Sequence, residues 1–377
     1  MKVLVISHTY IAKINREKWK VLAKQQPDLN LKVVFPDNWP DVLFELNSGN
    51  SNEDNLKNCE FISLPAFNTG NEILYGFYPK KLIKILKIFK PDLIHVEQGD
   101  NAFSYFQTIL LSKIFSPKSK FSFFTWINWK PKTSLKYKLF WTLIERFNRF
   151  FSNGAIVGNE DAQRLLKQKT FSKPVMVLPQ LGVDQNFFVP SSKLNNKYIG
   201  YVGRIEIEKG VLNLVDAFEK VSPDFSEWKL LFVGNGGARK NLYSYVLSKK
   251  LEHNVEFKDS VNHENVVSVL QSLDILVLPS YDTQMWREQF GHILIEAMSC
   301  NVPVIGSTGG EIANVISDAG LVFEQKNVEQ LSSCLKRLMQ DDNLREELGE
   351  KGFKRVQEHF SHQAVAKKTY EFWKSII

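Results

Sequence analysis

The stretch YIGYVGRIEIEKGVLNLVDAFEKV, residues 198–221, has the pattern of a β-strand, a turn and an α-helix in succession. Its apolar start predicts a strand that ends at Gly203, and VLNLVDAFEKV predicts the helix that follows. Arg204 and Lys209 lie between the two. Cations and free helix N–H groups at the carboxyl end of a strand favour phosphate binding. The alternative is that both residues are solvated surface cations in a loop.

The same pattern extends to both sides of this stretch. Apolar strands separated by helical segments predict parallel sheets covered by helices on both faces. Two such series predict an α/β protein of two doubly wound domains. The first series is KVLVIS, LKVVF, FISLP, DLIHV, FSFFTW, GAIVG and PVMVLP, and the second is YIGYVG, KLLFVG, NVEFKD, DILVLPS, VPVIGS and LVF.

A polar, turn-rich segment separates the two series of strands. It reads PSSKLNNK, residues 190–197, and predicts a domain boundary between residues 1–190 and 191–377. The last stretch, residues 342–377, is expected to be helical with no strand after it. Large apolar residues require it to dock on one of the domains, and they are Phe360, Tyr370, Phe372 and Trp373.

The composition is that of a soluble globular protein, and a length of 377 residues favours two domains. Cys59, Cys300 and Cys334 are far apart, which predicts neither a disulfide framework nor a zinc site and favours a reducing compartment. No stretch approaches the roughly 20 apolar residues that span a bilayer, and MKVLVISHTY is expected to be a first strand rather than a signal peptide. We therefore expect a cytoplasmic protein, with peripheral contact to the inner face of the membrane left open. The net charge of +7 suits an anionic partner or solubility alone.

A second segment, VLPSYDTQMWREQFGHILIEAMSC (277–300), places two carboxylates around a predicted helix start. Glu288 lies in the loop after a strand, helix formers begin near Gly291, and Glu296 lies within the helix. Carboxylates are poor phosphate ligands but good acceptors from hydroxyl groups. A nucleotide sugar, with many hydroxyls around a diphosphate, suits both carboxylates and the basic pair. In isolation, two surface charges would be the better interpretation.

These segments resemble the retaining glycosyltransferases of family four, which have the GT-B fold. That fold consists of two Rossmann-like domains that face each other across a cleft, and its C-terminal helix can pack back on the first domain. The family patterns are E-x-F-G-x-x-x-x-E-A-M, V-G-R-x-x-x-x-K-G and, matched here with one extra residue, P-x-G-V-D. The resemblance covers the second half of the chain and the strand pattern of the first. The matching residues are Glu288, Phe290, Gly291, Glu296, Ala297 and Met298; Val202, Gly203, Arg204, Lys209 and Gly210; and Pro179, Gly182, Val183 and Asp184.

The resemblance implies a role for each of these positions. Arg204 and Lys209 would hold the donor diphosphate, where negative charge grows as the glycosidic bond breaks. Glu296 would accept from ribose hydroxyls and Glu288 from hydroxyls of the transferred sugar. Arg204, Lys209 and Glu288 are the expected catalytic residues. No Asp-x-Asp pair occurs, so we expect neither a metal nor a cofactor. The other implied donor-side residues are Gly203, Val261, Phe290, Gly291 and His292.

The first half departs from the family pattern. The loop SHTYIAKINREKW (7–19) lacks the glycine pair that many members carry there. The segment FFTWINWK (123–130) has Asn128 where many members have a histidine. We expect Glu97 and Asn128 on the acceptor side.

A basic and aromatic stretch spans residues 113–151. An amphipathic basic helix with aromatic residues is typical of a membrane-surface element, and sheet-covering packing with a solvated basic face is the alternative. No nucleic-acid motif occurs, so no nucleic-acid partner is expected. The residues are Lys113, Lys118, Lys120, Lys130, Lys132, Lys136, Lys138, Arg146 and Arg149, with Trp126, Trp129, Phe140, Trp141, Phe147, Phe150 and Phe151, against the single acid Glu145.

The resemblance thus implies a polysaccharide-biosynthesis hexosyltransferase. It would transfer a UDP-linked hexose to a glycan or lipid-linked acceptor, with retention and without a metal. The second domain would bind the donor and the first the acceptor. The alternative is a catalytically inactive sugar-nucleotide-binding or membrane-surface adaptor protein. An oxidoreductase is disfavoured, because no G-x-G-x-x-G follows the first strand.

Overall fold

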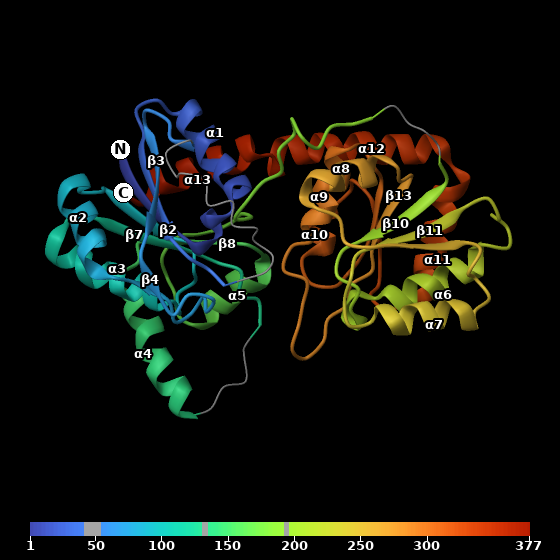
Figure 1. Ribbon diagram of the computed structural model, residues 1–377, viewed down its shortest axis with the longest axis horizontal. Coiled ribbons are helices and arrows are strands. Elements are labelled where there is room, and N and C mark those ends of the chain that lie inside the picture. The colour runs from blue at the N-terminus through green and yellow to red at the C-terminus, as the bar shows by residue number, and fades with distance from the viewer. Residues whose placement is uncertain (41–53, 130–134, 192–195) are drawn as a thin grey trace. The chain divides into compact units, whose positions relative to one another are not determined.

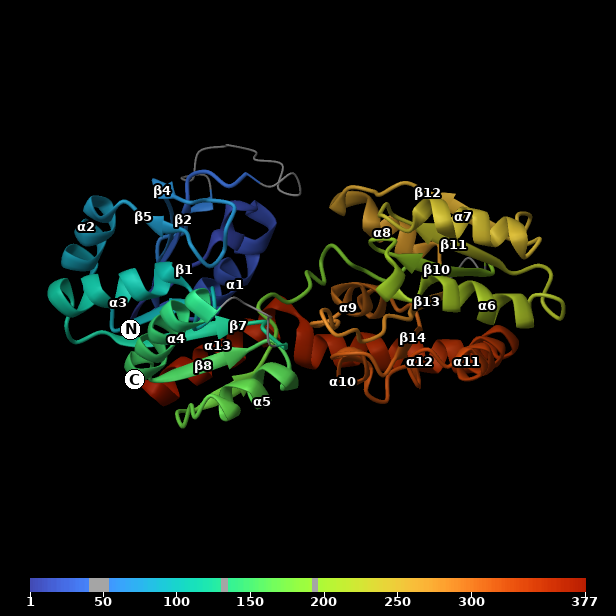
Figure 2. The ribbon, with the colours of Figure 1, turned by 90° about the horizontal axis from the view of Figure 1, so that it is seen from below.

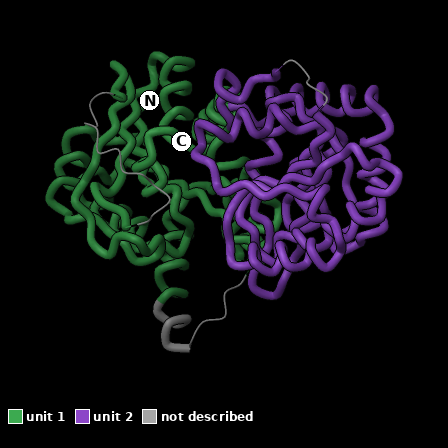
Figure 3. The backbone as a smooth tube through the Cα atoms, turned by 45° about the vertical axis from the view of Figure 1, so that its right-hand side comes forward, with its two compact units in different colours: residues 1–182, 362–377 green, residues 183–361 purple. Residues whose placement is uncertain are grey.

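The computed structural model describes residues 1–40, 54–129, 135–191 and 196–377, with side chains described in these ranges except at 135–140. The chain forms two compact units (Figure 3). Unit 1 comprises residues 1–182 and 362–377, and unit 2 comprises residues 183–361. This division differs from the expected boundary at residue 190. It also assigns the last helix to unit 1, because the apolar residues of that helix pack there.

Unit 1 contains a parallel sheet of seven strands in the order β3-β2-β1-β6-β7-β8-β9. Nearly all residues of its central strands are buried, as expected for a sheet covered on both faces. All seven strands predicted in the first half are present. They are β1 (Lys2–Ile6), β2 (Asn30–Pro36), β3 (Cys59–Leu64), β6 (Leu93–Val96), β7 (Lys120–Thr125), β8 (Gly154–Val157) and β9 (Val175–Val177). A short antiparallel pair, β4 (Ala66–Phe67) and β5 (Gly76–Phe77), was not predicted.

The helices of unit 1 cover its sheet on two faces. Helix α1 (Glu17–Gln25) packs against α13 (His362–Ile376), and the rings of Trp19 and Trp373 stack with centroids 5.4 Å apart. Figure 1 shows these two helices together on one side of the strands. The chain adds β1, β2 and β3 toward one edge of the sheet and β6 to β9 toward the other edge. Because parallel crossovers are right-handed, this change of direction places the remaining helices on the other face. These are α2 (Pro79–Phe89), α3 (Phe103–Phe115), α4 (Leu135–Phe151) and α5 (Glu160–Gln168).

Unit 2 contains a parallel sheet of six strands in the order β12-β11-β10-β13-β14-β15. All six strands predicted in the second half are present. They are β10 (Tyr198–Val202), β11 (Lys229–Val233), β12 (Val255–Lys258), β13 (Ile275–Leu278), β14 (Val304–Ser307) and β15 (Leu321–Phe323). The two-domain α/β fold is therefore as the sequence predicts.

Helices also cover both faces of the second sheet (Figure 2). Contacts group α6 (Val211–Val221) with α7 (Arg239–Ser248) and α11 (Val328–Gln340). A second group contains α8 (His263–Gln271), α9 (His292–Ser299), α10 (Ile312–Ile316) and α12 (Asp342–Arg355), which continues into a π-helical turn (Val356–Phe360). Among the described residues, no helix combines the length and apolar character needed to cross a bilayer.

Candidate active site

The order of strands in unit 2 identifies where a ligand would bind. The chain proceeds from β10 through β11 to β12 on one side of the sheet and then returns to β13 beside β10. In open α/β sheets, ligands bind outside the carboxyl ends of the strands at such a reversal. The loops after β10 and β13 carry Lys209 and Glu288, respectively. The two strands thus bring together residues that lie far apart in the sequence.

A tight turn holds Lys209 at this edge. Lys209 ends a single 3-10 turn, Ile207–Lys209, and Gly210 follows with φ of 71°. A Cβ atom at Gly210 would lie 2.1 Å from the carbonyl oxygen of Pro279, so only glycine allows the turn to approach the end of β13 so closely. The N–H of Tyr281 also donates to the carbonyl of Glu208 at 2.9 Å. The turn and the loop after β13 therefore form one connected structure.

Lys209 and Glu288 form an ion pair at the centre of this structure. Lys209 Nζ donates to Glu288 Oε2 at 2.6 Å, and Ser280 Oγ donates to the same oxygen at 3.2 Å. The lysine and glutamate side chains are 13% and 12% exposed. The ammonium also lies 4.5 Å from the ring centroid of Trp286. A nearly buried cation with one carboxylate and one aromatic partner is held in place before any ligand arrives.

The sequence predicted both residues of this pair but not their contact with each other. It assigned Lys209 to the diphosphate and Glu288 to the sugar. An ion pair at 2.6 Å places both side chains in one small region, so a ligand that meets one of them also meets the other.

The loop after β14 fixes the backbone of Glu288, a role that sequence reasoning missed. The N–H of Glu311 donates to the carbonyl oxygen of Glu288 at 3.1 Å. Gly310 has φ of 53°, and a Cβ atom there would lie 2.0 Å from the same oxygen. The N–H of Gly310 donates to Asp282 Oδ1 at 2.9 Å. The glycine pair in GSTGGE, residues 306–311, was the available signal for this close approach.

Helix α9 begins at His292, four residues after Glu288. Gly291 is its N-cap and His292 its exposed first residue, while Phe290 is buried and its ring packs 5.5 Å from that of Phe360. The first N–H groups of any α-helix have no acceptor within the helix and carry partial positive charge. The expected helix start near Gly291 is therefore confirmed, and the N-terminus of α9 follows the residue that forms the ion pair.

Glu296 occupies the second turn of α9. Its side chain is partly exposed, and burial raises the pKa of its carboxyl group from 4.5 to about 7. Within the described part of the chain, its carboxylate has no hydrogen-bond donor or cationic partner. A carboxylate in such surroundings gains most from a ligand that donates hydroxyl groups.

The other expected donor-side residues also lie at the carboxyl ends of the strands. Gly203 directly follows β10, and the side chain of Arg204 is exposed beside it. The carbonyl of Arg204 accepts a hydrogen bond from the buried Tyr201 hydroxyl. Val261 follows β12, in a loop that Ser260 joins to Asn235, the residue two positions after β11, by a hydrogen bond of 3.0 Å.

In unit 1 the reversal of strand order lies between β1 and β6, and Glu97 follows β6 there. Glu97 does not reach solvent. Lys18 Nζ donates to Glu97 Oε1 at 3.2 Å and to the carbonyl of Gln180 at 2.8 Å, and the Lys18 and Glu97 side chains are 2% and 0% exposed. Gln180 Nε2 and the Tyr10 hydroxyl donate to the other carboxylate oxygen. Burial opposes the charge of Glu97, but Lys18 and the hydrogen bonds lower its pKa well below the usual range.

This buried network gives Glu97 a structural role within unit 1. Asn128, the other expected acceptor-side residue, follows β7 and is also buried, at 4% exposure. A cluster that sequence reasoning missed lies at the same edge. Gln98 Nε2 and His8 Nδ1 are 2.6 Å apart, and the His8 ring stacks on Trp39 with centroids 4.4 Å apart. Gln98 Oε1 is buried and has no hydrogen-bond partner among the described residues.

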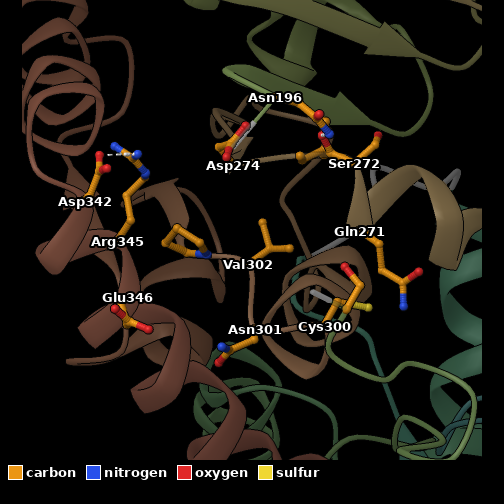
Figure 4. A pocket seen from close by; sticks show the side chains of 13 residues that line it. Asn196, Gln271, Ser272, Asp274, Cys300, Asn301, Val302, Asp342, Arg345 and Glu346 are labelled. Atoms are coloured by element: carbon orange, nitrogen blue, oxygen red, sulfur yellow. Dashed lines mark hydrogen bonds and ion pairs between the residues drawn. The ribbon is translucent and has the colours of Figure 1, made fainter. Parts of the chain in front are cut away.

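A cavity of about 310 Å³ in unit 2 lies at the opposite edge of the sheet (Figure 4). It is lined by Asp274, which precedes β13, by Pro303, which precedes β14, and by the α12 residues Asp342 and Arg345, which form an ion pair. It is therefore separate from the Lys209–Glu288 site. Among the described residues, no group of three or more His, Cys, Asp or Glu side chains could hold a metal ion.

Sequence comparison matches most of unit 2 to a known family of proteins. Residues 183–355 match a family model described as "Glycosyl transferases group 1". The chain is 30% identical over 193 residues to the capsular polysaccharide biosynthesis glycosyltransferase CapM of Staphylococcus aureus, covering 48% of this chain and 49% of that protein. It is 27% identical to a GDP-mannose-dependent monoacylated alpha-(1-6)-phosphatidylinositol monomannoside mannosyltransferase of Corynebacterium glutamicum, covering 54% of this chain and 58% of that protein.

The match to these curated relatives spans about half of their length. The fold as a whole is similar to that of Anabaena HepE in complex with UDP, with a TM-score of 0.73, 16% identity and complete coverage of both chains. The family-model match, residues 183–355, thus covers almost all of unit 2.

Proposed function

We propose that the protein is a retaining glycosyltransferase that transfers a hexose from a nucleotide sugar to a glycan or lipid-linked acceptor. The observation that carries the proposal is the Lys209–Glu288 ion pair at the reversal of strand order in unit 2. It places a cation and a hydroxyl acceptor beside the N-terminus of α9. A nucleotide sugar has an anionic centre between two polyhydroxyl groups, and this combination fits it.

In the proposed reaction, Lys209 and Arg204 bind the donor diphosphate with the first N–H groups of α9. The bond between the anomeric carbon and the diphosphate oxygen breaks, and its electron pair goes to that oxygen. The two cations and the helix N–H groups stabilise the negative charge that develops there. Two side-chain cations supply this stabilisation without requiring a metal. The acceptor hydroxyl oxygen then bonds to the anomeric carbon on the face from which the diphosphate leaves, and its proton goes to the departing diphosphate oxygen. Attack on this face retains the configuration.

The ion pair would change partners when the donor binds. Lys209 moves part of its interaction from Glu288 to the diphosphate, and Glu288 accepts from hydroxyls of the transferred sugar. Trp286 keeps the ammonium in place while this exchange occurs. Glu296 accepts from the ribose hydroxyls, and Val261 lies beside the base.

The nature of the donor and the acceptor rests on the relatives. HepE has been crystallised with UDP, whereas the C. glutamicum relative is named for GDP-mannose. We favour a UDP-linked hexose because the HepE fold matches over the whole chain. CapM is named for capsular polysaccharide and the C. glutamicum enzyme for a lipid-linked glycan, which supports an acceptor of either kind. On the acceptor side, His8 and Gln98 replace Glu97 and Asn128 as our preferred contacts, because Glu97 is held inside a hydrogen-bonded network.

Release of nucleoside diphosphate from a panel of nucleotide sugars tests the proposal. The panel contains UDP-glucose, UDP-N-acetylglucosamine and GDP-mannose, each with and without added glycan acceptors. Turnover is expected with at least one donor and should fall at least tenfold in Glu288→Gln. The matched control, Glu324→Gln, changes an exposed glutamate of unit 2 and should leave turnover unchanged.

Two results would argue against the proposal. Binding without release of nucleoside diphosphate would favour the catalytically inactive adaptor. Failure of the protein to bind any donor would remove the assignment of the site altogether. Proton NMR of the first product formed distinguishes retention from inversion at the anomeric carbon.

A further inference from the structure

Three neighbouring helices of unit 1 end in the same kind of tripeptide. Helix α2 ends in Lys87-Ile88-Phe89, α3 in Lys113-Ile114-Phe115, and α4 in Arg149-Phe150-Phe151. In each case a cation precedes a large apolar residue and a phenylalanine. The phenylalanines face the protein, since Phe89 is 6% exposed and the other two are partly buried.

The middle residue of each tripeptide faces solvent. Ile88, Ile114 and Phe150 are 70%, 69% and 77% exposed. Large apolar side chains at this exposure contribute nothing to the core of unit 1. Three of them at the same position of three adjacent helices form a row, which we call the apolar row.

Cations join the helix ends into one surface. Lys87 of α2 lies 4.7 Å from the ring centroid of Phe115 at the end of α3. Lys113 of α3 lies 4.8 Å from the ring centroid of Phe151 at the end of α4. The helix ends are therefore adjacent, and the cation of one helix end contacts the phenylalanine of the next.

The surface around the apolar row is strongly basic. Helices α2 and α3 contain no acidic residue, and α4 contains only Glu145. Arg149 and Lys169 both contact the carboxylate of Glu145, at 3.2 and 3.1 Å. Asp92, in the loop after α2, accepts from the backbone N–H of Lys2. Lys80 and Lys81 lie in the first turn of α2, at its other end. The exposed cations nearer the ends of the three helices are Lys84, Lys87, Lys90, Lys113, Lys118, Arg146 and, at the start of β7, Lys120.

We infer that the apolar row and its surrounding cations bind the surface of an anionic lipid bilayer. Isolated apolar tips can enter the boundary between headgroups and acyl chains, while lysine and arginine side chains remain at the level of the lipid phosphates. A protein partner would be expected to require a continuous apolar patch with a polar rim. Here each exposed apolar side chain comes from a separate helix and directly follows a cation in the sequence. This inference is independent of the proposed transfer reaction.

The structure also changes which residues of the basic stretch at 113–151 would contact lipid. Trp141 is 6% exposed and Phe147 packs on Phe106, so neither belongs to the surface. Lys130 and Lys132 lie outside the described residues, and the side chains of Lys136, Lys138 and Phe140 are not described. Helix α2, which that stretch did not include, contributes Ile88 and its lysines.

Cosedimentation with vesicles tests the inference on the full-length protein. Vesicles of phosphatidylglycerol and phosphatidylcholine are expected to bind the protein, and vesicles of phosphatidylcholine alone should bind it at least tenfold less. The triple variant Ile88→Ser, Ile114→Ser, Phe150→Ser should bind the anionic vesicles at least about tenfold less, since three apolar side chains no longer enter the bilayer. The control Tyr243→Ser, Leu247→Ser removes two exposed apolar residues of α7 in unit 2 and should bind like the wild type.

Several outcomes would overturn the inference. These are equal binding of the triple variant, equal binding to both vesicle types, or no binding at all. Light scattering tests a further outcome that would overturn the inference. If the wild type is a dimer and the triple variant is a monomer, a second copy of the chain covers the apolar row. Donor binding, measured on the same samples, should be unchanged in both variants. If the wild type bound no nucleotide-sugar donor, the proposed function would be contradicted, and the result with lipid vesicles would still stand.

Discussion

Glu296 should make the affinity for a nucleotide sugar depend on pH. Its pKa is about 7 in the free protein, because burial disfavours the charged form. A carboxylate accepts hydrogen bonds from two ribose hydroxyls, whereas the protonated form accepts less well. The donor should therefore bind mainly to the ionised state. About nine tenths of the protein is ionised at pH 8 and about one tenth at pH 6, so the apparent Kd should be roughly tenfold higher at pH 6.

The ligand for this experiment must be the intact nucleotide sugar. A free nucleoside diphosphate has a terminal phosphate that itself titrates near pH 6, whereas the diphosphate of a nucleotide sugar does not. Isothermal titration calorimetry at pH 6, 7 and 8 gives the Kd. Repeating the titration in buffers of different ionisation enthalpy gives the number of protons that the protein releases or takes up when the donor binds. Binding at pH 7 should release about half a proton, because hydroxyl donors lower the pKa of the bound carboxylate.

Glu296→Gln is the matched variant, because it keeps the shape of the side chain and removes the titration. Its Kd should be the same at pH 6 and pH 8, with no proton released at Glu296. A wild-type Kd that does not change between pH 6 and pH 8 would refute the assigned contact. The same conclusion would follow if Glu296→Gln retained the full pH dependence.

The same raised pKa has a consequence for stability. The unfolded chain ionises this carboxyl group near pH 4.3, and the folded chain ionises it only near pH 7. Unit 2 therefore loses stability as the pH rises from 4 to 7, and the loss is then constant. After allowance for partial exposure, Glu296→Gln should stabilise the protein by about 2 kcal/mol at pH 8 and by almost nothing at pH 4. Thermal unfolding at the two pH values measures this difference, and equal effects at both would contradict it.

Three further substitutions test other parts of the structure. Trp286→Leu should lower kcat/KM by about three- to tenfold, because Lys209 loses the ring beneath its ammonium; unchanged steady-state kinetics would remove that positioning role. Glu97→Gln should destabilise the fold by about 3–5 kcal/mol in denaturant unfolding, because the buried lysine that it pairs with loses its counter-charge, and a change below 1 kcal/mol would mean that the pair is dispensable. Gly310→Ala should reduce kcat at least about tenfold, because a Cβ atom there displaces the backbone of Glu288, and wild-type turnover would show that this approach is not needed.

The strands were largely predictable from the sequence because parallel strands buried on both faces have continuous apolar runs. KVLVIS corresponds to β1 and DILVLPS to β13, and each of the other predicted runs also corresponds to a strand. The pair β4 and β5 was not predictable, because two residues per strand leave no periodic pattern. The unit to which α13 belongs was also not fixed by its own composition. Its apolar face identifies a docking helix, but only the complementary face of α1 determines where it docks.

The site was predictable at the level of residues and not of contacts. Strand-end position and residue type selected Lys209 and Glu288 separately. Their ion pair depends on β10 and β13 being adjacent, which is a property of strand order. The buried contacts of Glu97 were not predictable for a related reason. A carboxylate at a strand end suggests a ligand contact, but its buried partner Lys18 comes from a different crossover and has no signature in the sequence.

The return of the chain to unit 1 affects the order in which the protein can fold during synthesis. Trp373 is fully buried against Trp19, yet the ribosome makes all of unit 2 between the first segment of unit 1 and α13. At the usual rates of translation this interval is roughly 10 to 40 seconds. During this interval the first segment of unit 1 lacks α13, which with α1 covers one face of its sheet. Unit 2 is a single uninterrupted segment, so it can complete its core first. The exposed face of α1 is therefore the part of this chain that a chaperone would be expected to shield.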